Sequence, residues 1–204
     1  MAESLRIDHA VVSGTFSLDG ETHEVDNNIW VIGNDEECLV IDAPHDVEAI
    51  MDVVAGRQVK AIVLTHAHDD HSRMAPALRE RVTAPILLHP DDKPVWELTH
   101  PDHLWDVDLT DDQSLKIAGA SVKVLHTPGH APGAVCLYVH DLGVVFTGDT
   151  LFQGGPGATG RSFSDADVIV ESIRAKLFRL PPETVVHTGH GDSTTIAKEQ
   201  EALG

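Results

Sequence analysis

The sequence predicts an α/β protein built as a four-layer αββα sandwich, in which two mixed β-sheets face each other and helices cover the outside. Two observations favour this fold. Short apolar segments bounded by turn residues, typical of buried strands, come first and then alternate with segments of helical pattern. The same order occurs again in the C-terminal half. Since no linker, low-complexity tract or block of charge interrupts residues 1–204, we expect a single domain.

In the first half, the pattern predicts strands joined by helices. The strands are expected at Thr22–Gly33, Cys38–Asp42, Val59–Leu64 and Pro85–Leu88. Asp46 is typical of a helix N-cap, and its helix is expected to reach Ala55 before Gly56 ends it. Two further helices are expected, at Met74–Arg81 and Asp91–Leu98.

The second half predicts a similar set of elements. Its strands are expected at Ser114–Ile117, Ser121–His126, Ala134–His140, Gly143–Thr147 and Thr184–His187. Ser164 and Asp167 have the spacing of a capping box and predict a helix with an apolar stripe from Ile169 to Leu180. Ser193 is a candidate cap for a final helix. The glycine-rich segment Gly148–Phe163 is long for a simple connection, which is typical of a functional loop.

Composition limits the partners of the chain. It carries 14 Lys and Arg against 33 Asp and Glu, a net charge of −19 with histidine neutral. Because this charge repels phosphate backbones, we expect no nucleic-acid partner. No apolar run approaches the ~20 residues of a membrane helix, and the first residues lack an apolar signal region, so we expect a cytoplasmic protein without a membrane partner. Cys38 and Cys136 are expected to be buried, unpaired thiols.

The strongest functional signal is THAHDDH, Thr65–His71, directly after the apolar segment AIVL. In extended backbone the side chains at i and i+2 point the same way, so His66 and His68 can share one metal ion. If the chain then turns toward the helix expected at Met74, Asp70 and His71 reach a neighbouring position. Taken alone, this segment leaves a His-rich surface loop as an alternative.

Three later segments share one pattern, in which a strand is followed by Thr and Gly and then by a potential ligand. They are HTPGH ending at His130, VFTGD ending at Asp149 and VVHTGH ending at His190. Glycine before the ligand permits unusual backbone angles and a close approach of the chain. Taken singly, each segment could be a strand-terminal turn with an incidental polar residue. Together with the first motif, the three segments disfavour that interpretation.

The number of ligands indicates catalysis. His66, His68 and His130 form one expected site, Asp70, His71 and His190 form a second, and Asp149 is expected to bridge them. A structural zinc is closed by four protein ligands. Here each metal has three ligands of its own and a shared carboxylate, which leaves a position for solvent.

These motifs resemble the metallo-β-lactamase superfamily and, within it, the glyoxalase II (hydroxyacylglutathione hydrolase) branch, from about Asn28 to Thr195. The resemblance is carried by THAHDDH at 65–71, TPGHAPGAVCLY at 127–138, FTGDTLF at 146–152 and GHG at 189–191. It implies the metallo-β-lactamase fold and metal binding by the seven residues named above. It also implies a supporting role for Asp42, in VIDAP, as an acid that orients the ligands.

Two departures leave the thiol carrier of the substrate open. Full-length glyoxalase II has a C-terminal helical extension that grips glutathione, whereas this chain ends 14 residues after His190. The short basic phrase that follows TGDTLF in the family reads QGGPGATGRSF here. Arg161 is the candidate to bind a substrate carboxylate, and the alternative is an ordinary surface arginine.

The resemblance implies a binuclear zinc hydrolase of small molecules. We expect a hydroxide bridging two Zn²⁺ ions to attack an acyl carbonyl, because the ions lower the pKa of water from about 15.7 to roughly 7. Asp70 is expected to orient this hydroxide as well as to bind metal. A thioester such as S-lactoylglutathione suits the site because thiolate is a good leaving group. Iron or manganese would also fit the ligands.

Other readings stay open from the sequence. Persulfide dioxygenases resemble the chain as well, and would hold one iron at His66, His130 and Asp149. A lactonase or β-lactamase is a third option, and a non-catalytic metal-binding protein a fourth. The oligomeric state is not predicted. Of the other histidines, His45 is expected to be an ordinary surface or loop residue. His89, at a strand end, is expected to be structural, with approach to the site as the alternative.

Overall fold

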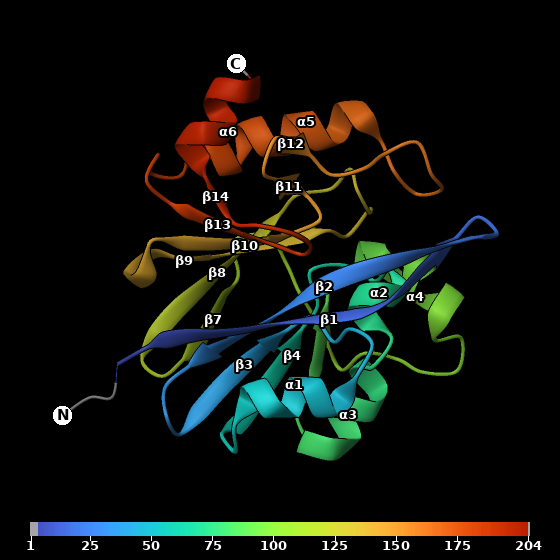
Figure 1. Ribbon diagram of the computed structural model, residues 1–204, viewed down its shortest axis with the longest axis vertical. Helices are drawn as coiled ribbons and strands as arrows, with labels where there is room; N and C mark the ends of the chain where they lie inside the picture. Colours follow the sequence, from blue (N-terminus) through green and yellow to red (C-terminus); the bar gives the residue numbers. More distant parts are fainter. Residues whose placement is uncertain (1–3, 204) are drawn as a thin grey trace.

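The computed structural model describes residues 4–203 and confirms two stacked mixed sheets with helices on both outer faces (Figure 1). The first sheet has the order β1-β2-β3-β4-β5-β6. Its strands are β1 (Arg6–Leu18), β2 (Glu21–Gly33), β3 (Glu37–Ile41), β4 (Gln58–Val63), β5 (Ile86–Leu88) and β6 (Val107–Asp108). Pairing is antiparallel from β1 to β3 and parallel from β3 to β6.

The second sheet has the order β14-β13-β10-β9-β8-β7. Its strands are β7 (Ser114–Ile117), β8 (Ala120–His126), β9 (Val135–Val139), β10 (Val144–Gly148), β13 (Val185–Thr188) and β14 (Thr194–Thr195). Only β10 and β13 pair in parallel. The two-stranded sheet of β11 (Leu151–Phe152) and β12 (Gly155–Pro156) lies within the segment that we expected to be a functional loop.

Helices form the outer layers. On the first sheet lie α1 (Val47–Val54), α2 (Asp69–Ser72), α3 (Ala75–Val82) and α4 (Lys93–Thr99), and on the second lie α5 (Ala166–Ala175) and α6 (Ile196–Leu203). Three apolar clusters hold the layers together, one between the sheets and one beneath each helical layer. Cys38 and Cys136 are buried in the two outer clusters as unpaired thiols. Among the described residues, no helix has the length and apolar character to cross a membrane.

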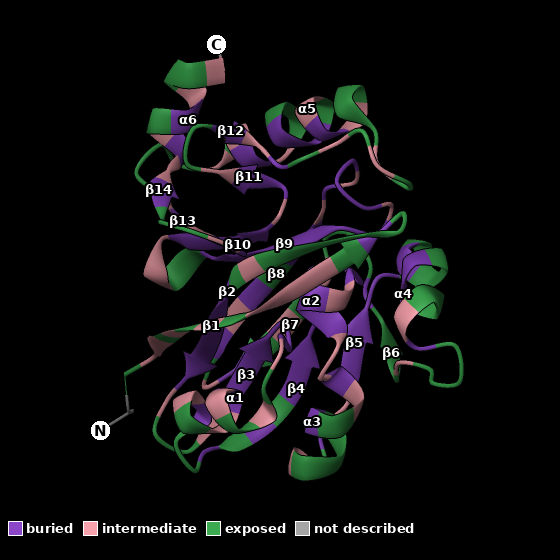
Figure 2. Cartoon of the chain, turned by 45° about the vertical axis from the view of Figure 1, so that its right-hand side comes forward, coloured by how far each residue is buried: buried purple, intermediate pink, exposed green. Residues whose placement is uncertain are grey.

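The central strands explain why their sequences are apolar almost throughout. In β4 and the residue that follows it, Ile62 and Leu64 pack beneath the helices, while Ala61 and Val63 face the other sheet. Successive side chains of a strand point to opposite faces, and here both faces are covered. The buried colouring of these strands is visible in Figure 2.

Strand β1 was not predicted from the sequence. It pairs with β2 along its whole length, from Arg6 opposite Gly33 to Leu18 opposite Glu21, around a turn at Asp19 and Gly20. Most of its residues are only partly buried because it is the outer strand of its sheet. Its sequence therefore lacks the apolar run that marks a buried strand.

Two predicted helix starts were wrong. The helix expected from Ser164 and Asp167 is capped by Asp165, whose side chain accepts from the amides of Asp167 and Val168. Ser193 does not cap α6, because β14 comes first and the Ser193 hydroxyl pairs with His187. In contrast, Asp46 caps α1 as expected.

Other predicted helix bounds shifted. The helix expected at Met74–Arg81 is observed as α3, and the additional short helix α2 precedes it. The helix expected at Asp91–Leu98 is divided into a 3₁₀ turn, Pro90–Asp92, and α4.

The strand directions bring several strand ends to one edge of the sandwich. Strands β8 and β10 both run antiparallel to β9, and β13 runs parallel to β10, so the residues after β8, β10 and β13 lie at the same edge. The residues after β4 join them, because the Val135 amide at the start of β9 donates to the Thr65 carbonyl (2.8 Å). This edge holds the four segments predicted to carry metal ligands.

Candidate metal centre

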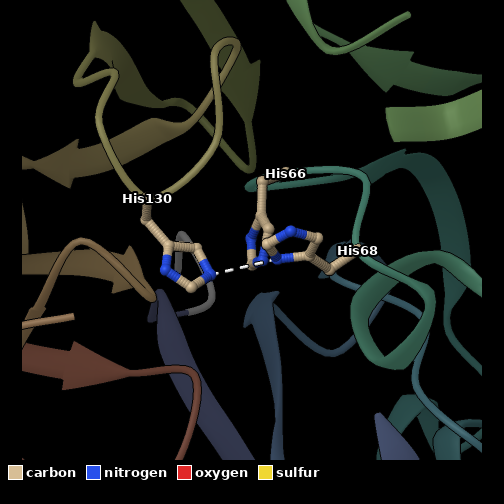
Figure 3. A group of neighbouring side chains, drawn as sticks. All are labelled: His66, His68 and His130. Atoms are coloured by element: carbon tan, nitrogen blue, oxygen red, sulfur yellow. Dashed lines mark hydrogen bonds between the residues drawn. The ribbon is translucent and has the colours of Figure 1, made fainter. Parts of the chain in front are cut away.

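The structure brings together all seven side chains that the sequence singled out. The donor atoms of His66, His68 and His130 lie within 4.8 Å of one another, and those of Asp70, His71 and His190 do the same. We call these groups the three-histidine trio and the aspartate trio. In Figure 3, His66 and His68 project from the segment after β4 toward His130, which follows β8. Metal binding by these residues stays a prediction.

Most of these histidines are held by one ring nitrogen, which leaves the other for the centre. The Nδ1 atom of His71 donates to the Asp42 carboxylate (2.8 Å), that of His130 to the Ala158 carbonyl (2.8 Å) and that of His190 to the Asp26 carbonyl (2.7 Å). Partners of this kind fix the orientation and tautomer of histidines that bind metals.

Asp42 also organises His66, through Thr65. Its carboxylate accepts from the Thr65 amide (2.7 Å) and from the Thr65 hydroxyl (2.9 Å). Since the hydroxyl proton is used in this way, the Thr65 oxygen accepts from His66 Nδ1 (3.1 Å). The remaining nitrogen, His66 Nε2, is buried without a hydrogen-bond partner among residues 4–203. Asp42 therefore has the position expected of an acid that orients the ligands.

The spacing of the donor atoms fits bound metal ions. His68 Nδ1 lies 3.0 Å from His130 Nε2, and His71 Nε2 lies 3.3 Å from His190 Nε2. Tetrahedral coordination with bonds of about 2.0–2.1 Å separates neighbouring ligand atoms by about 3.3 Å. Imidazole and carboxylate ligands suit zinc, iron and manganese. The residues present therefore fit the predicted metals.

Asp149 lies between the two trios. Its Oδ1 atom is 3.2 Å from His71 Nε2, and its Oδ2 atom is 3.4 Å from His190 Nε2 and 3.6 Å from His130 Nε2. Asp70 Oδ2 is 3.2 Å from His190 Nε2. One carboxylate therefore reaches nitrogens of both groups, which is the arrangement that a bridging ligand requires.

The two trios differ in protonation. Burial and the neighbouring His130 lower the pKa of His68 to about 3, and burial likewise lowers the pKa of His66. Burial alone would also lower the pKa of His190, but Asp149 and hydrogen bonds to Asp149 and Asp70 raise it to about 10. The pKa of His71 is raised as well, because Asp70, Asp149 and Asp42 outweigh its burial. Without metal, the aspartate trio therefore holds protons at neutral pH.

Two glycines allow this crowding. At Gly189, before His190, a Cβ atom would lie 2.3 Å from Asp149 Oδ1 and 2.7 Å from His71 Cε1. At Gly148, before Asp149, the backbone has a φ of 49° and a Cβ would lie 2.5 Å from Thr65 Oγ1. Both positions therefore require glycine because neighbouring atoms leave no room for a Cβ atom. Gly148 also requires it because of its positive φ.

Two side chains behind Asp70 were not predicted from the sequence. Asn27 is buried and donates to Asp70 Oδ2 (3.1 Å), while its carbonyl oxygen accepts from His45 Nε2 (2.7 Å). The expectation that His45 is an ordinary loop residue is therefore wrong. A signal for Asn27 exists in the sequence, since two asparagines directly precede the apolar run IWVIG of β2.

His89 does not lie among the seven predicted ligands. Its ring stacks on that of His126, with centroids 3.9 Å apart and an interplanar angle of 11°. The nitrogens of this pair and a carboxylate oxygen of Asp91 form a separate group. Stacked parallel rings direct their nitrogens along separate planes, so the pair does not present two lone pairs to one ion.

A cavity of about 370 Å³ opens over the centre. Its walls come from the tip of the β1–β2 hairpin and from the segment after Asp149, and they include Phe16, Val25, Ala158 and Arg161. The Arg161 guanidinium lies over the Phe16 ring, 5.1 Å from its centroid, and one of its nitrogens is 3.1 Å from His23 Nε2. Arg161 is thus at the cavity and not on a remote surface.

The amino-acid sequence of the chain is similar to those of several known proteins. The sequence model described as "Metallo-beta-lactamase superfamily" matches residues 24–190. The probable metallo-hydrolase YqgX of Bacillus subtilis is 34% identical over 85% of this chain and 89% of its own. Hydroxyacylglutathione hydrolase GloC of Haemophilus influenzae is 31% identical over 86% and 90%. For the hydroxyacylglutathione hydrolase of Aeromonas salmonicida, 35% identical, the match covers 81% of this chain but only 61% of that enzyme.

Solved structures share the fold over nearly the full chain. The BLEG-1 B3 metallo-beta-lactamase matches with a TM-score of 0.79 and 32% identity, covering 93% of this chain and 97% of its own. TTHA1623 in a di-iron-bound form matches at 0.78 and 31%, covering 94% and 98%. ETHE1 from Myxococcus xanthus matches at 0.76 and 26%, covering 94% and 83%.

Asp42→Asn is expected to weaken metal binding about 10- to 100-fold, because an amide cannot accept from both Thr65 and His71 as the carboxylate does. Competition against a chromophoric chelator measures the affinity. Asp52→Asn, an exposed position on α1, is the matched control and should bind like the wild type. Equal affinities for all three proteins would contradict the role of Asp42.

Metal loading at pH 7 is expected to release protons. In the metal-free protein His190, with a pKa of about 10, and His71 are protonated, and each must lose its proton to bind a metal. Metal affinity should accordingly fall as the pH is lowered. Titration calorimetry in buffers of different ionisation enthalpy measures the release, and a binding enthalpy that is independent of the buffer would disprove it.

Proposed function

The chain belongs to the metallo-beta-lactamase superfamily of metallo-hydrolases, and we propose that within it this protein is a binuclear zinc thioesterase. The proposed substrate is a small hydroxyacyl thioester such as S-lactoylglutathione. Hydroxyacylglutathione hydrolases are among its relatives at 31–35% identity, which supports this substrate class. The unpaired, buried Cys38 and Cys136 favour a reducing compartment, so we propose the cytoplasm.

The single observation that carries the proposal is the completeness of both trios with Asp149 between them. A mono-iron site at His66, His130 and Asp149 would leave Asp70, His71 and His190 without a metal to bind. These three residues are nevertheless oriented by Asn27, Asp42 and the Asp26 carbonyl. The hydrogen bonds that orient these three side chains favour two metal ions over one.

The cavity supplies the means to hold an acyl thioester. Two bound Zn²⁺ ions would supply a nucleophilic water near neutral pH and polarise the acyl carbonyl. Asp70, which accepts a hydrogen bond from Asn27, would in turn accept one from this water and so orient it. Phe16 and Val25 form an apolar wall beside this position, and Arg161 offers the cation for a carboxylate of the thiol portion. A departing thiolate requires little protonation, so the mechanism needs no dedicated acid.

Removal of metal should abolish thioester cleavage, and added Zn²⁺ should restore it. Turnover of S-lactoylglutathione is measured before and after treatment with chelator, together with the metal content per chain. His190→Ala should lose one metal equivalent and most of the activity, whereas His140→Ala, whose side chain is 84% exposed, should behave as the wild type. Unchanged turnover by the stripped protein would end this proposal.

The metal content per chain and turnover assays on other substrates separate the alternative functions. One iron per chain with oxygen uptake on a persulfide would indicate a dioxygenase. Cleavage of a lactone or a β-lactam in preference to the thioester would indicate the third function, which the likeness to the BLEG-1 B3 metallo-beta-lactamase makes worth including.

Arg161→Ala is expected to raise KM for a carboxylate-bearing thioester about 10-fold or more while kcat changes little, because the arginine contacts the substrate away from the reacting carbonyl. A thioester without a carboxylate should show no such change. Arg81→Ala, an exposed position on α3 outside the cavity, is the control. If both substrates respond alike, Arg161 does not bind the carboxylate.

A further inference from the structure

Behind the three-histidine trio lies a carboxylate that the chemistry above does not use. Asp92 is fully buried at the end of the 3₁₀ turn after β5. Its Oδ2 atom accepts from the Ala67 amide (2.6 Å), and its Oδ1 atom accepts from the Gly133 amide (2.5 Å). Ala67 stands between His66 and His68, and Gly133 follows His130 by three residues. One side chain therefore links the two loops that carry this trio.

Burial of the Asp92 carboxylate costs free energy of folding. No lysine or arginine among residues 4–203 forms an ion pair with Asp92, and burial raises its pKa to about 7. Burial of an unpaired charge opposes folding. A carboxylate does, however, offer two acceptor atoms on a short, rigid side chain, and the two amides that it meets come from different loops.

The contact is tight from both sides. A Cβ atom on Gly133 would lie 2.6 Å from the Asp92 amide nitrogen and 2.8 Å from the Asp92 Cβ atom, so only glycine lets this loop approach. Asp92 itself is fixed by its amide, which donates to the His89 carbonyl (3.0 Å), and by α4, which begins at the next residue. The link therefore joins two loops to a rigid part of the first sheet.

We propose that Asp92 is a positioning residue that sets the separation of His66 and His68 from His130, and with it the metal affinity of the three-histidine trio. Asp42 contacts Thr65 and His71, whereas Asp92 contacts Ala67 and Gly133, so the two buried acids hold different parts of the centre. This inference rests on the proposed function, since it concerns the binding of the same metals.

The test is a titration of the metal-free full-length protein with Co²⁺, followed by its visible spectrum, which reports the geometry of each site. His68→Ala and His190→Ala identify the binding step that belongs to each trio. Asp92→Asn removes one acceptor, and Gly133→Ala disturbs the same contact from the other loop at a position where the backbone is compatible with alanine. Asp91→Asn, one residue away with a side chain that is 59% exposed, is the matched control.

Both variants should weaken the step of the three-histidine trio about 10- to 100-fold and change its cobalt spectrum, while the step of the aspartate trio stays within about 3-fold of wild type. Asp91→Asn should leave both steps unchanged. Thermal unfolding of each metal-free variant shows that it is folded. Equal weakening of both steps, or of neither, would overturn the proposal. A wild type that binds no metal would instead remove the proposed function, and this inference with it.

Discussion

The rest of the centre depends on the crowding of two carboxylates and five imidazoles into one buried place. Asp70 and Asp149 bring negative charge to within 3.2 Å of histidine nitrogens, and ring nitrogens face each other at 3.0 and 3.3 Å. Such a group is stable only when cations neutralise it. In the metal-free protein, protons on His71 and His190 perform this task. Bound metal ions would therefore compete with these protons for the same nitrogen atoms.

The fold tolerates this crowding because the predicted ligands are held by rigid elements. Each of the four ligand-bearing segments follows a strand that is paired on both sides or covered by another layer. The backbone and the buried acids Asp42 and Asp92 then restrict the loops that follow. The energy that assembles the site therefore comes from the apolar clusters between the layers, at a distance from the polar groups that need it.

The sequence was sufficient to predict the sandwich and the convergence of the seven candidate ligands, since both leave local patterns. Apolar runs mark strands such as β4, and the motif after it has ligand spacing within seven residues. Strand β1 left no such pattern, because pairing with β2 rather than burial holds it in place. Asn27, His45 and Asp92 were missed because their roles arise from contacts between segments that are far apart in the chain. For Asp92, its place in the short turn that follows the apolar strand β5 was an available signal.

The cavity walls and the ligands belong to different parts of the chain. Phe16, His23 and Val25 lie on the β1–β2 hairpin, and Ala158 and Arg161 lie in the segment after Asp149, whereas the ligands directly follow buried strands or stand in the loops behind them. Phe16 also packs edge-on against the His68 ring (centroids 5.2 Å apart), so His23 and Val25 are the hairpin positions where a replacement alters the shape and charge of the entrance with least effect on a predicted ligand. Such separation of selectivity from reactivity lets one scaffold acquire new substrates through few substitutions, and it makes the hairpin the natural place to begin directed evolution of this enzyme.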